Sequence, residues 1–345
     1  MSPRQQLDAL VDLFAPDIRS AFLAAIQDVT DTVLIEQLIA AIEAGDVEAA
    51  FRALGFSDGA MRPLTAAIER AFEQGGVMVG RLTFPKYLNT PNGRAVFRFD
   101  VRNSRAEAYL RDKSSSLVSQ ITESARINVQ SALTVGMEKG VNPRSVALDL
   151  VGRLDPASGK RVGGSIGLSA NQEGWARSAR TKLEMLDEAY FNMELRDKRF
   201  DRTVAKAIKD GKPLPADTVN KLIGRYRDNA LRWRGENIAR TEAMQALNHS
   251  EYEATRQAVD LGAVKNENVK REWDDAGDGR VRPTHRLLNG QRVGLDEPFV
   301  IPATITRREV RMLHPGDTSL GAPVREIAMC RCRVRSVIDW LADLD

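Results

Sequence analysis

The chain has 345 residues, of which 43% are hydrophobic and 28% charged, and its formal net charge is +3. This composition is typical of a globular protein and excludes a fibrous or largely disordered chain, and the length exceeds what one hydrophobic core usually supports. No stretch approaches eighteen uncharged apolar residues, and the first residues lack the apolar run of a secretory signal. We therefore expect two or three domains and no membrane span.

Charge is distributed unevenly along the chain. Residues 1–76 carry five Arg and no Lys against twelve acidic residues, which gives an excess of seven negative charges. Residues 196–240 carry thirteen Lys and Arg against six acidic residues, which gives an excess of seven positive charges. An acidic end and a basic middle are typical either of solvated helix faces or of contacts with charged partners, and both interpretations stay open.

Residues 1–80 are expected to form an acidic bundle of short amphipathic helices. Their apolar residues recur at helical spacing, and Pro16, Gly45, Gly55 and the Gly75-Gly76 pair separate the runs. The bundle is either a plain structural unit or a docking module.

Residues 81–103 are expected to be a strand or hairpin linker. A turn pattern at residues 90–93 precedes an alternation of apolar and polar residues over 95–101, which is typical of a strand beside a turn.

Residues 104–262 are expected to form a middle domain of long helices. One helix should run from an N-cap at Asn103-Ser104 to about residue 139, and a shorter one should follow over 145–153. Helical patterns return over residues 170–210 and 217–262, with a bend expected near Gly235. The last helix should carry a C-terminal α+β module, residues 263–345, so the fold class is mainly α with a small α+β C-terminal part.

Most of the chemically distinctive residues lie between Trp273 and Val334. Both cysteines of the chain and two of its three histidines fall in this stretch. Two cysteines separated by one residue do not make a disulfide framework, so a reducing compartment is expected. The third histidine, His249, lies on the expected long helix, where a solvent-facing or hydrogen-bonded side chain is the simplest interpretation.

The order of motifs in this stretch resembles that of the Mu F-like minor head proteins of tailed phages, also called head morphogenesis proteins. An Ala-Arg-Thr-Glu segment at 239–242 and a glycine-rich segment at 163–169 extend the resemblance to about residues 140–336. The motifs within the module are Trp273, an Asp-rich turn with Arg280 and Arg282, His285, Asn289-Gly290-Gln291, Pro298-Phe299, Pro315-Gly316-Asp317 and Cys330-Arg331-Cys332.

The resemblance implies a structural role in the virion. It implies a minor capsid protein inside the head, oligomeric at the portal vertex, that acts in head assembly or genome delivery and passes through the host cytoplasm during assembly. The implied partners are the portal protein, the major capsid protein or scaffold, and double-stranded DNA without sequence preference, and no membrane is implied.

The cysteines and histidines of the module allow a structural zinc site. On a strand, Cys330 and Cys332 would project to the same face, and His285 with His314 would complete a tetrahedral set. One of Asp274, Asp275, Asp278 and Asp317 is the alternative to His314 as the ligand that completes the set. The alternative is that both thiols are small buried hydrophobic groups.

Two further interpretations concern the polar residues of the module. The first is an enzyme, either a zinc hydrolase or a metal-dependent or barnase-like nuclease, with His285 as general base beside Asp278 and phosphate-binding arginines. The second, which we favour, is a non-enzymatic polar network that fixes the module on its helix. Its predicted members are Arg240, Glu242, Asp275, Asp278, Arg280, Arg282 and Arg331.

The basic middle of the chain is the expected DNA-binding surface. Lys and Arg that neutralise phosphates supply affinity without reading sequence. The residues predicted to do so are Lys198, Arg199, Arg202, Lys206, Arg225 and Arg227.

Overall fold

The computed structural model describes residues 3–56 and 58–342. This part of the chain contains twelve α-helices, three 3-10 helices and nine short strands, and 61% of the residues are helical. The expected fold class, mainly α with a small α+β C-terminal part, is confirmed. The chain divides into two compact units: unit 1 comprises Met1–Arg19, Leu64–Lys113 and Glu236–Asp345, and unit 2 comprises Ser20–Pro63 and Ser114–Gly235.

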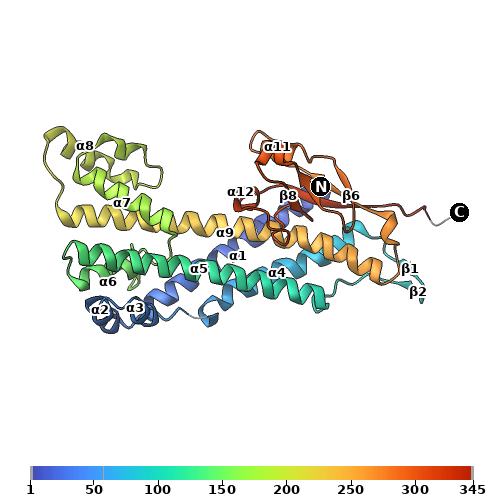
Figure 1. Ribbon diagram of the computed structural model, residues 1–345, viewed down its shortest axis with the longest axis horizontal. Coiled ribbons are helices and arrows are strands. Elements are labelled where there is room, and N and C mark those ends of the chain that lie inside the picture. The colour runs from blue at the N-terminus through green and yellow to red at the C-terminus, as the bar shows by residue number, and fades with distance from the viewer. Residues whose placement is uncertain (1–2, 57, 343–345) are drawn as a thin grey trace. The chain divides into compact units, whose positions relative to one another are not determined.

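Four long helices contribute residues to both units. They are α1 (Pro3–Asp31), α4 (Asp58–Thr83), α5 (Ser104–Glu138) and α9 (Ala216–Asp260) (Figure 1). The expectation of short helices in residues 1–80 is wrong for α1 and α4, because α1 continues through Pro16 and α4 through Gly75 and Gly76. α9 is likewise a single helix through Gly235.

The glycines inside α4 permit close packing within unit 1. A Cβ atom at Gly76 would lie 2.3 Å from the ring of Phe99, and one at Gly80 would lie 2.7 Å from the ring of Phe97. The two rings occupy the space that larger side chains would need. These glycines therefore serve packing and do not end the helix.

One short helix of unit 2 is as expected, and one long helix is not. The helix expected over 145–153 is present as α6, but the helix expected over 170–210 is interrupted. α7 ends before Leu186, whose φ of 54° is left-handed and cannot continue a helix. The remaining elements of unit 2 are α2 (Ile35–Glu43), α3 (Val47–Ala53), α6 (Pro143–Val151), β3 (Arg153–Leu154), β4 (Arg161–Val162), α7 (Ala170–Glu184), η1 (Glu188–Asn192), η2 (Lys198–Phe200) and α8 (Asp201–Asp210).

The linker expected at residues 81–103 contains a hairpin, β1 (Leu88–Thr90) paired with β2 (Gly93–Ala95). The strand expected over 95–101 is wrong, since residues 96–101 are outside any strand. Phe97 and Phe99 of this segment pack against α4. The alternation of apolar and polar residues therefore reflects packing on a helix and not pairing with a neighbouring strand.

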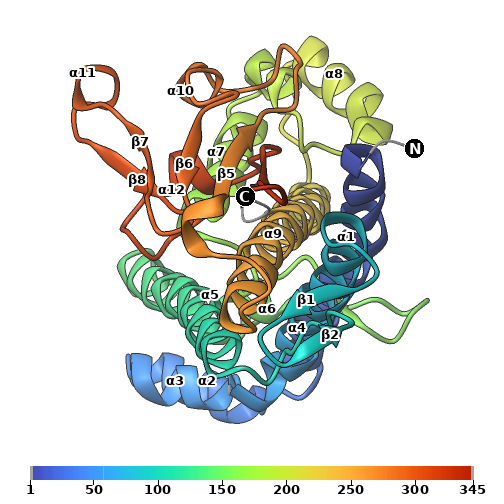
Figure 2. The same cartoon turned by 90° about the vertical axis from the view of Figure 1, so that its right-hand side faces the viewer.

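The C-terminal module of unit 1 contains two small antiparallel sheets. One has the order β6-β5-β9 and the other pairs β7 with β8; Figure 2 shows β7 and β8 as a separate arm that carries α11. The core around Trp273 and Phe299 includes both cysteines. The elements are η3 (Asn266–Asn268), β5 (Val269–Asp274), α10 (Pro283–Arg286), β6 (Arg292–Gly294), β7 (Phe299–Ile301), α11 (Ala303–Thr306), β8 (Val310–Met312), α12 (Val324–Ile327) and β9 (Arg333–Ile338).

Side chains of α9 cover the outer edge of β9. Asn248 Oδ1 accepts a hydrogen bond from Val334 N at 3.0 Å, and Glu251 Oε1 accepts one from Ser336 N at 3.0 Å. Four residues after Glu251, the hydroxyl of Thr255 lies 2.6 Å from that of Ser336. Because these contacts replace the missing neighbouring strand, the helix fixes the register and the position of the module.

The predicted domain boundaries at residues 80, 103 and 262 stay a prediction. The two compact units divide the chain differently, since each unit collects segments that are distant in sequence. Among the described residues, no helix combines the length and apolar character needed to cross a membrane.

Candidate functional site

Three side chains with metal-ligand chemistry meet in the core of the module. His285 Nδ1 lies 3.4 Å from Cys330 Sγ and 3.5 Å from Cys332 Sγ, and the three ligand atoms are all within 4.8 Å of one another. The side chains are nearly inaccessible, with exposed fractions of 1%, 4% and 2% for His285, Cys330 and Cys332. Neither cysteine is in a disulfide. The predicted grouping of these three residues is thus present in the structure.

Local backbone features bring the three residues together. Pro283 occupies the first turn of α10, where its missing N–H is no loss, and His285 follows on the buried face. Cys330 follows α12 and comes directly after Met329, whose φ of 55° turns the chain. The two cysteines precede β9 and do not lie in it, so the expectation of two sulfurs on a strand is corrected, although both still face one imidazole.

A buried carboxylate lies on the other side of the His285 ring. Glu326 Oε2 is 3.3 Å from His285 Nε2, and the same oxygen accepts a hydrogen bond from Thr284 Oγ1 at 2.8 Å. The indole of Trp273 meets the imidazole edge to face, with ring centroids 5.2 Å apart. His285 Nε2 lies near this carboxylate without completing a hydrogen bond to it, and Nδ1 faces the two sulfurs.

Two residues of α9 hold the backbone that carries the cysteines. Thr241 Oγ1 accepts a hydrogen bond from Met329 N at 3.0 Å. Asn248 Nδ2 donates to Cys332 O and also to Pro315 O, both at 3.1 Å. Figure 1 shows this half of α9 beside the C-terminal elements. Asn248 and Glu326 could not be predicted from the sequence, because neither stands in a recognisable spacing to the cysteines.

The two thiols influence each other strongly. The hydrogen bond with Cys332 and the neighbouring His285 lower the pKa of Cys330 well below its usual range. The same contact, together with burial, raises the pKa of Cys332. The backbone N–H of Cys332 also lies 3.5 Å from Cys330 Sγ and donates to it. Of the two cysteines, Cys330 is therefore the one whose thiolate form is favoured.

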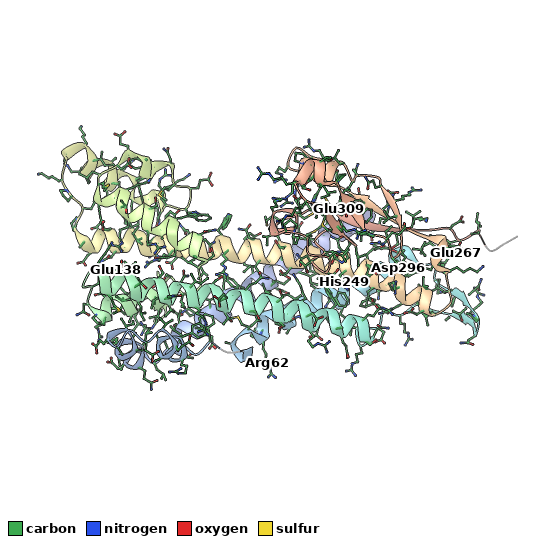
Figure 3. All side chains as sticks on the ribbon, viewed as in Figure 1. Arg62, Glu138, His249, Glu267, Asp296 and Glu309 are labelled. Carbon is green, nitrogen blue, oxygen red and sulfur yellow. The ribbon has the colours of Figure 1, made fainter. Side chains whose placement is uncertain are left out.

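His314 is not part of this group, contrary to the predicted ligand set. Its Nδ1 lies 3.2 Å from Pro315 O and its Nε2 lies 3.0 Å from His249 Nδ1, so both ring nitrogens are engaged. His249 stacks on Tyr109 with ring centroids 3.5 Å apart. Figure 3 shows His249 on the α9 ribbon, beside the module. The expectation of a hydrogen-bonded His249 agrees with this geometry.

The aspartates considered as further ligands have other roles. Asp317 accepts hydrogen bonds from Leu313 N and Ser319 N, and Asp275 accepts one from Gly277 N. Neither Asp274 nor Asp278 belongs to the group of three that the structure brings together in its described part.

The predicted polar network is a set of separate local contacts. Asp278 forms a two-pronged ion pair with Arg331, which lowers the pKa of Asp278, and lies 3.5 Å from Arg280. Arg282 donates to Ala328 O. On α9, Arg240 lies 3.9 Å from Glu236, and Glu242 lies 3.1 Å from Lys113. The expectation of one connected network is therefore corrected, although the contacts of Asp278, Arg331 and Arg282 do fix the loops around the cysteines.

The basic residues predicted to bind DNA are only partly available at the surface. Arg227 is 7% exposed and is held by Glu173 at 2.6 Å, which excludes it from a surface phosphate site. Arg225 is half-buried. Four residues in or next to α8 are exposed: Lys198, Arg199, Arg202 and Lys206.

Two of these four exposed cations have acidic neighbours. Arg199 lies 2.6 Å from Asp197, and Lys206 lies 2.7 Å from Asp210. Such exposed pairs are weak, so they compete with a phosphate without blocking it.

Comparison with known families adds a direct observation for the C-terminal half of the chain. Residues 198–335 match the family model described as Phage Mu protein F like protein. These residues are similar to the Mu F-like family. The matched residues, called here the Mu F-like region, contain α8, α9 and the module with His285, Cys330 and Cys332. The resemblance of this region to phage head morphogenesis proteins is confirmed.

The match covers less than half of the chain, and its extension to residues 140–197 stays a prediction. No curated protein and no solved structure matches the chain.

Proposed function

We propose that the protein is a minor capsid protein of a tailed phage, located inside the head near the portal and acting in head assembly or genome delivery. The observation that carries the proposal is the match of residues 198–335 to the Mu F-like family. The proposed partners are the portal protein and the major capsid protein or scaffold. The protein is proposed to be oligomeric at the portal vertex and to pass through the host cytoplasm before packaging.

The proposal includes contact with packaged DNA through the exposed cations at Lys198, Arg199, Arg202 and Lys206. Four side chains within nine residues, all exposed, give a concentrated positive surface inside the Mu F-like region. Each phosphate that is neutralised releases condensed counterions. Three to four contacts predict a slope of about −3 for log affinity against log salt concentration on duplex DNA.

Binding measured over a salt series tests the DNA contact. Replacing Lys198, Arg199, Arg202 and Lys206 with Glu should abolish the salt-dependent binding while the fold persists, because these side chains are exposed. A control variant carries the same change in net charge on four exposed cations elsewhere, Arg81, Arg111, Lys139 and Arg144, each replaced with Glu. Equal loss in both variants, or no affinity at low salt in the parent protein, would contradict a local binding surface.

We propose a non-enzymatic role for the module. A general base must reach the proton that it removes, and His285 is 1% exposed between two sulfurs and a carboxylate. His285→Ala is therefore expected to lower the stability of the protein and its incorporation into heads, without abolishing any catalytic activity. Cleavage of DNA or RNA by the parent protein that disappears in this variant would instead support the nuclease alternative.

A further inference from the structure

We propose that His285, Cys330 and Cys332 bind one zinc ion, with His285 coordinating through Nδ1 and the two cysteines through their sulfurs. The ion joins α10 to the segment before β9 and stabilises the module.

The spacing of the three atoms fits tetrahedral coordination. Bonds of about 2.3 Å to sulfur and about 2.0 Å to nitrogen place a tetrahedral N···S edge at roughly 3.6 Å. The two N···S distances are 3.4 and 3.5 Å, so one ion at bonding distance from all three atoms requires little movement. Thiolate with imidazole ligands in this geometry selects zinc over harder cations such as magnesium or calcium.

The surroundings of His285 support coordination through Nδ1. A histidine that binds a metal through one nitrogen usually donates its other N–H to a carboxylate or carbonyl oxygen. Glu326 lies 3.3 Å from Nε2, is almost completely buried, and is itself held by Thr284. Nε2 has no hydrogen-bond partner in the described part of the chain, and an ion bound at the Nδ1 lone pair would place the Nε2 proton on the carboxylate side, where it could donate to Glu326.

Hydrogen bonds hold the backbone around the two cysteines in place, as is usual for residues that bind a metal. Asn248 fixes the carbonyl of Cys332, Thr241 fixes the N–H before Cys330, and the N–H of Cys332 donates to Cys330 Sγ. An N–H that donates to sulfur stabilises a thiolate, which is the form that binds metal.

Two other chemistries fit these residues less well. A nucleophilic cysteine needs one accessible thiolate, whereas both sulfurs are buried and lie at nearly the same distance from the imidazole. A disulfide between residues separated by one position is strained. It would also not explain why the His285 imidazole faces both sulfurs or why Glu326 is buried beside it.

The fourth ligand is proposed to be water. Among the described residues, only three protein atoms gather at the site. A pocket of about 200 Å³ adjoins it and is lined by Cys330, Met329, Arg240, Met244 and Asp8, among others. Water in this pocket would have access to the ion beside Cys330.

The test is metal analysis of the full chain, purified without added metal and without a metal-affinity tag. We expect about one zinc per chain, and X-ray absorption at the zinc edge should show two sulfur neighbours. Cys332→Ser should lose the zinc. Val334→Ala is the matched control, because it removes core volume two residues away and should keep the metal. Glu326→Gln should weaken zinc binding about 10- to 100-fold in competition with a chelator.

A measurement on the unmodified protein covers the case in which Cys332→Ser does not fold. A mercurial reagent that blocks thiols should release one zinc for every two thiols modified. A folded, metal-free protein with two titratable thiols would overturn the proposal and leave buried thiols, and a disulfide between Cys330 and Cys332 would overturn it as well.

Discussion

Replacing Asn248 with Ala should release the C-terminal module from α9. The Asn248 side chain donates to Pro315 O and Cys332 O and accepts from Val334 N, and all three bonds are buried. Alanine leaves the N–H of Val334 and the carbonyl of Cys332 without this partner, whereas Pro315 O keeps its contact with His314 Nδ1. A buried unsatisfied polar group costs about 1–3 kcal/mol. Because a carbonyl group tolerates the loss better than an N–H, we expect a total cost of about 3 kcal/mol.

Hydrogen exchange followed by mass spectrometry measures this cost locally. A loss of about 3 kcal/mol corresponds to roughly 100-fold faster exchange in a peptide covering residues 329–338. Asn229→Ala is the matched control on the same helix, since Asn229 donates to Leu195 O at 3.0 Å and accepts from Arg232 at 2.8 Å, both within unit 2. It should leave exchange of residues 329–338 unchanged. Unaltered exchange of this peptide in Asn248→Ala would refute the inference that α9 positions the module.

Two further predictions concern pH and packing. Burial lowers the pKa of His249 well below its usual value and also lowers that of His314, so below about pH 6.5 the unfolded chain binds protons that the folded chain does not. Urea unfolding should therefore show that the free energy of unfolding decreases as the pH is lowered below about 6.5. The decrease should reach up to about 1.4 kcal/mol per pH unit for each histidine. The difference between the parent and His249→Gln isolates this effect from Glu242 and Glu251, whose raised pKa values act in the opposite direction; an identical pH profile for both proteins would contradict it. Gly76→Ala should cost about 1–3 kcal/mol, because its Cβ would meet Phe99 at 2.3 Å. Gly174→Ala, where no atom lies within 4 Å, should gain up to about 1 kcal/mol, and equal thermal shifts in the two variants would argue against the packing explanation.

The sequence predicts helices well where apolar periodicity is long and uninterrupted. The helix expected from Asn103-Ser104 to about residue 139 corresponds to α5, and Asn103 Oδ1 accepts a hydrogen bond from Arg105 N as a cap should. The prediction fails where local signals are overridden by packing. Gly75 and Gly76 resemble a helix end, yet neighbouring side chains require small residues at that position.

The candidate site could be predicted in part for a similar reason. Cys330, Cys332 and His285 have chemistry that is visible in the sequence, and they do meet. His314 has the same chemistry, but the fold pairs it with His249 across 65 residues, and no spacing rule indicates this contact. Arg227 was expected at the surface because it lies in a basic stretch, but the acidic partner that draws it inward, Glu173, is more than fifty residues away.

The central proposal, a minor head protein near the portal, is tested most directly by cross-linking mass spectrometry of purified heads of the phage proposed to encode this chain. We predict that the protein is present in the heads and that its cross-links include the portal protein. Absence of the chain from purified heads, or cross-links confined to proteins outside the head, would contradict the proposal.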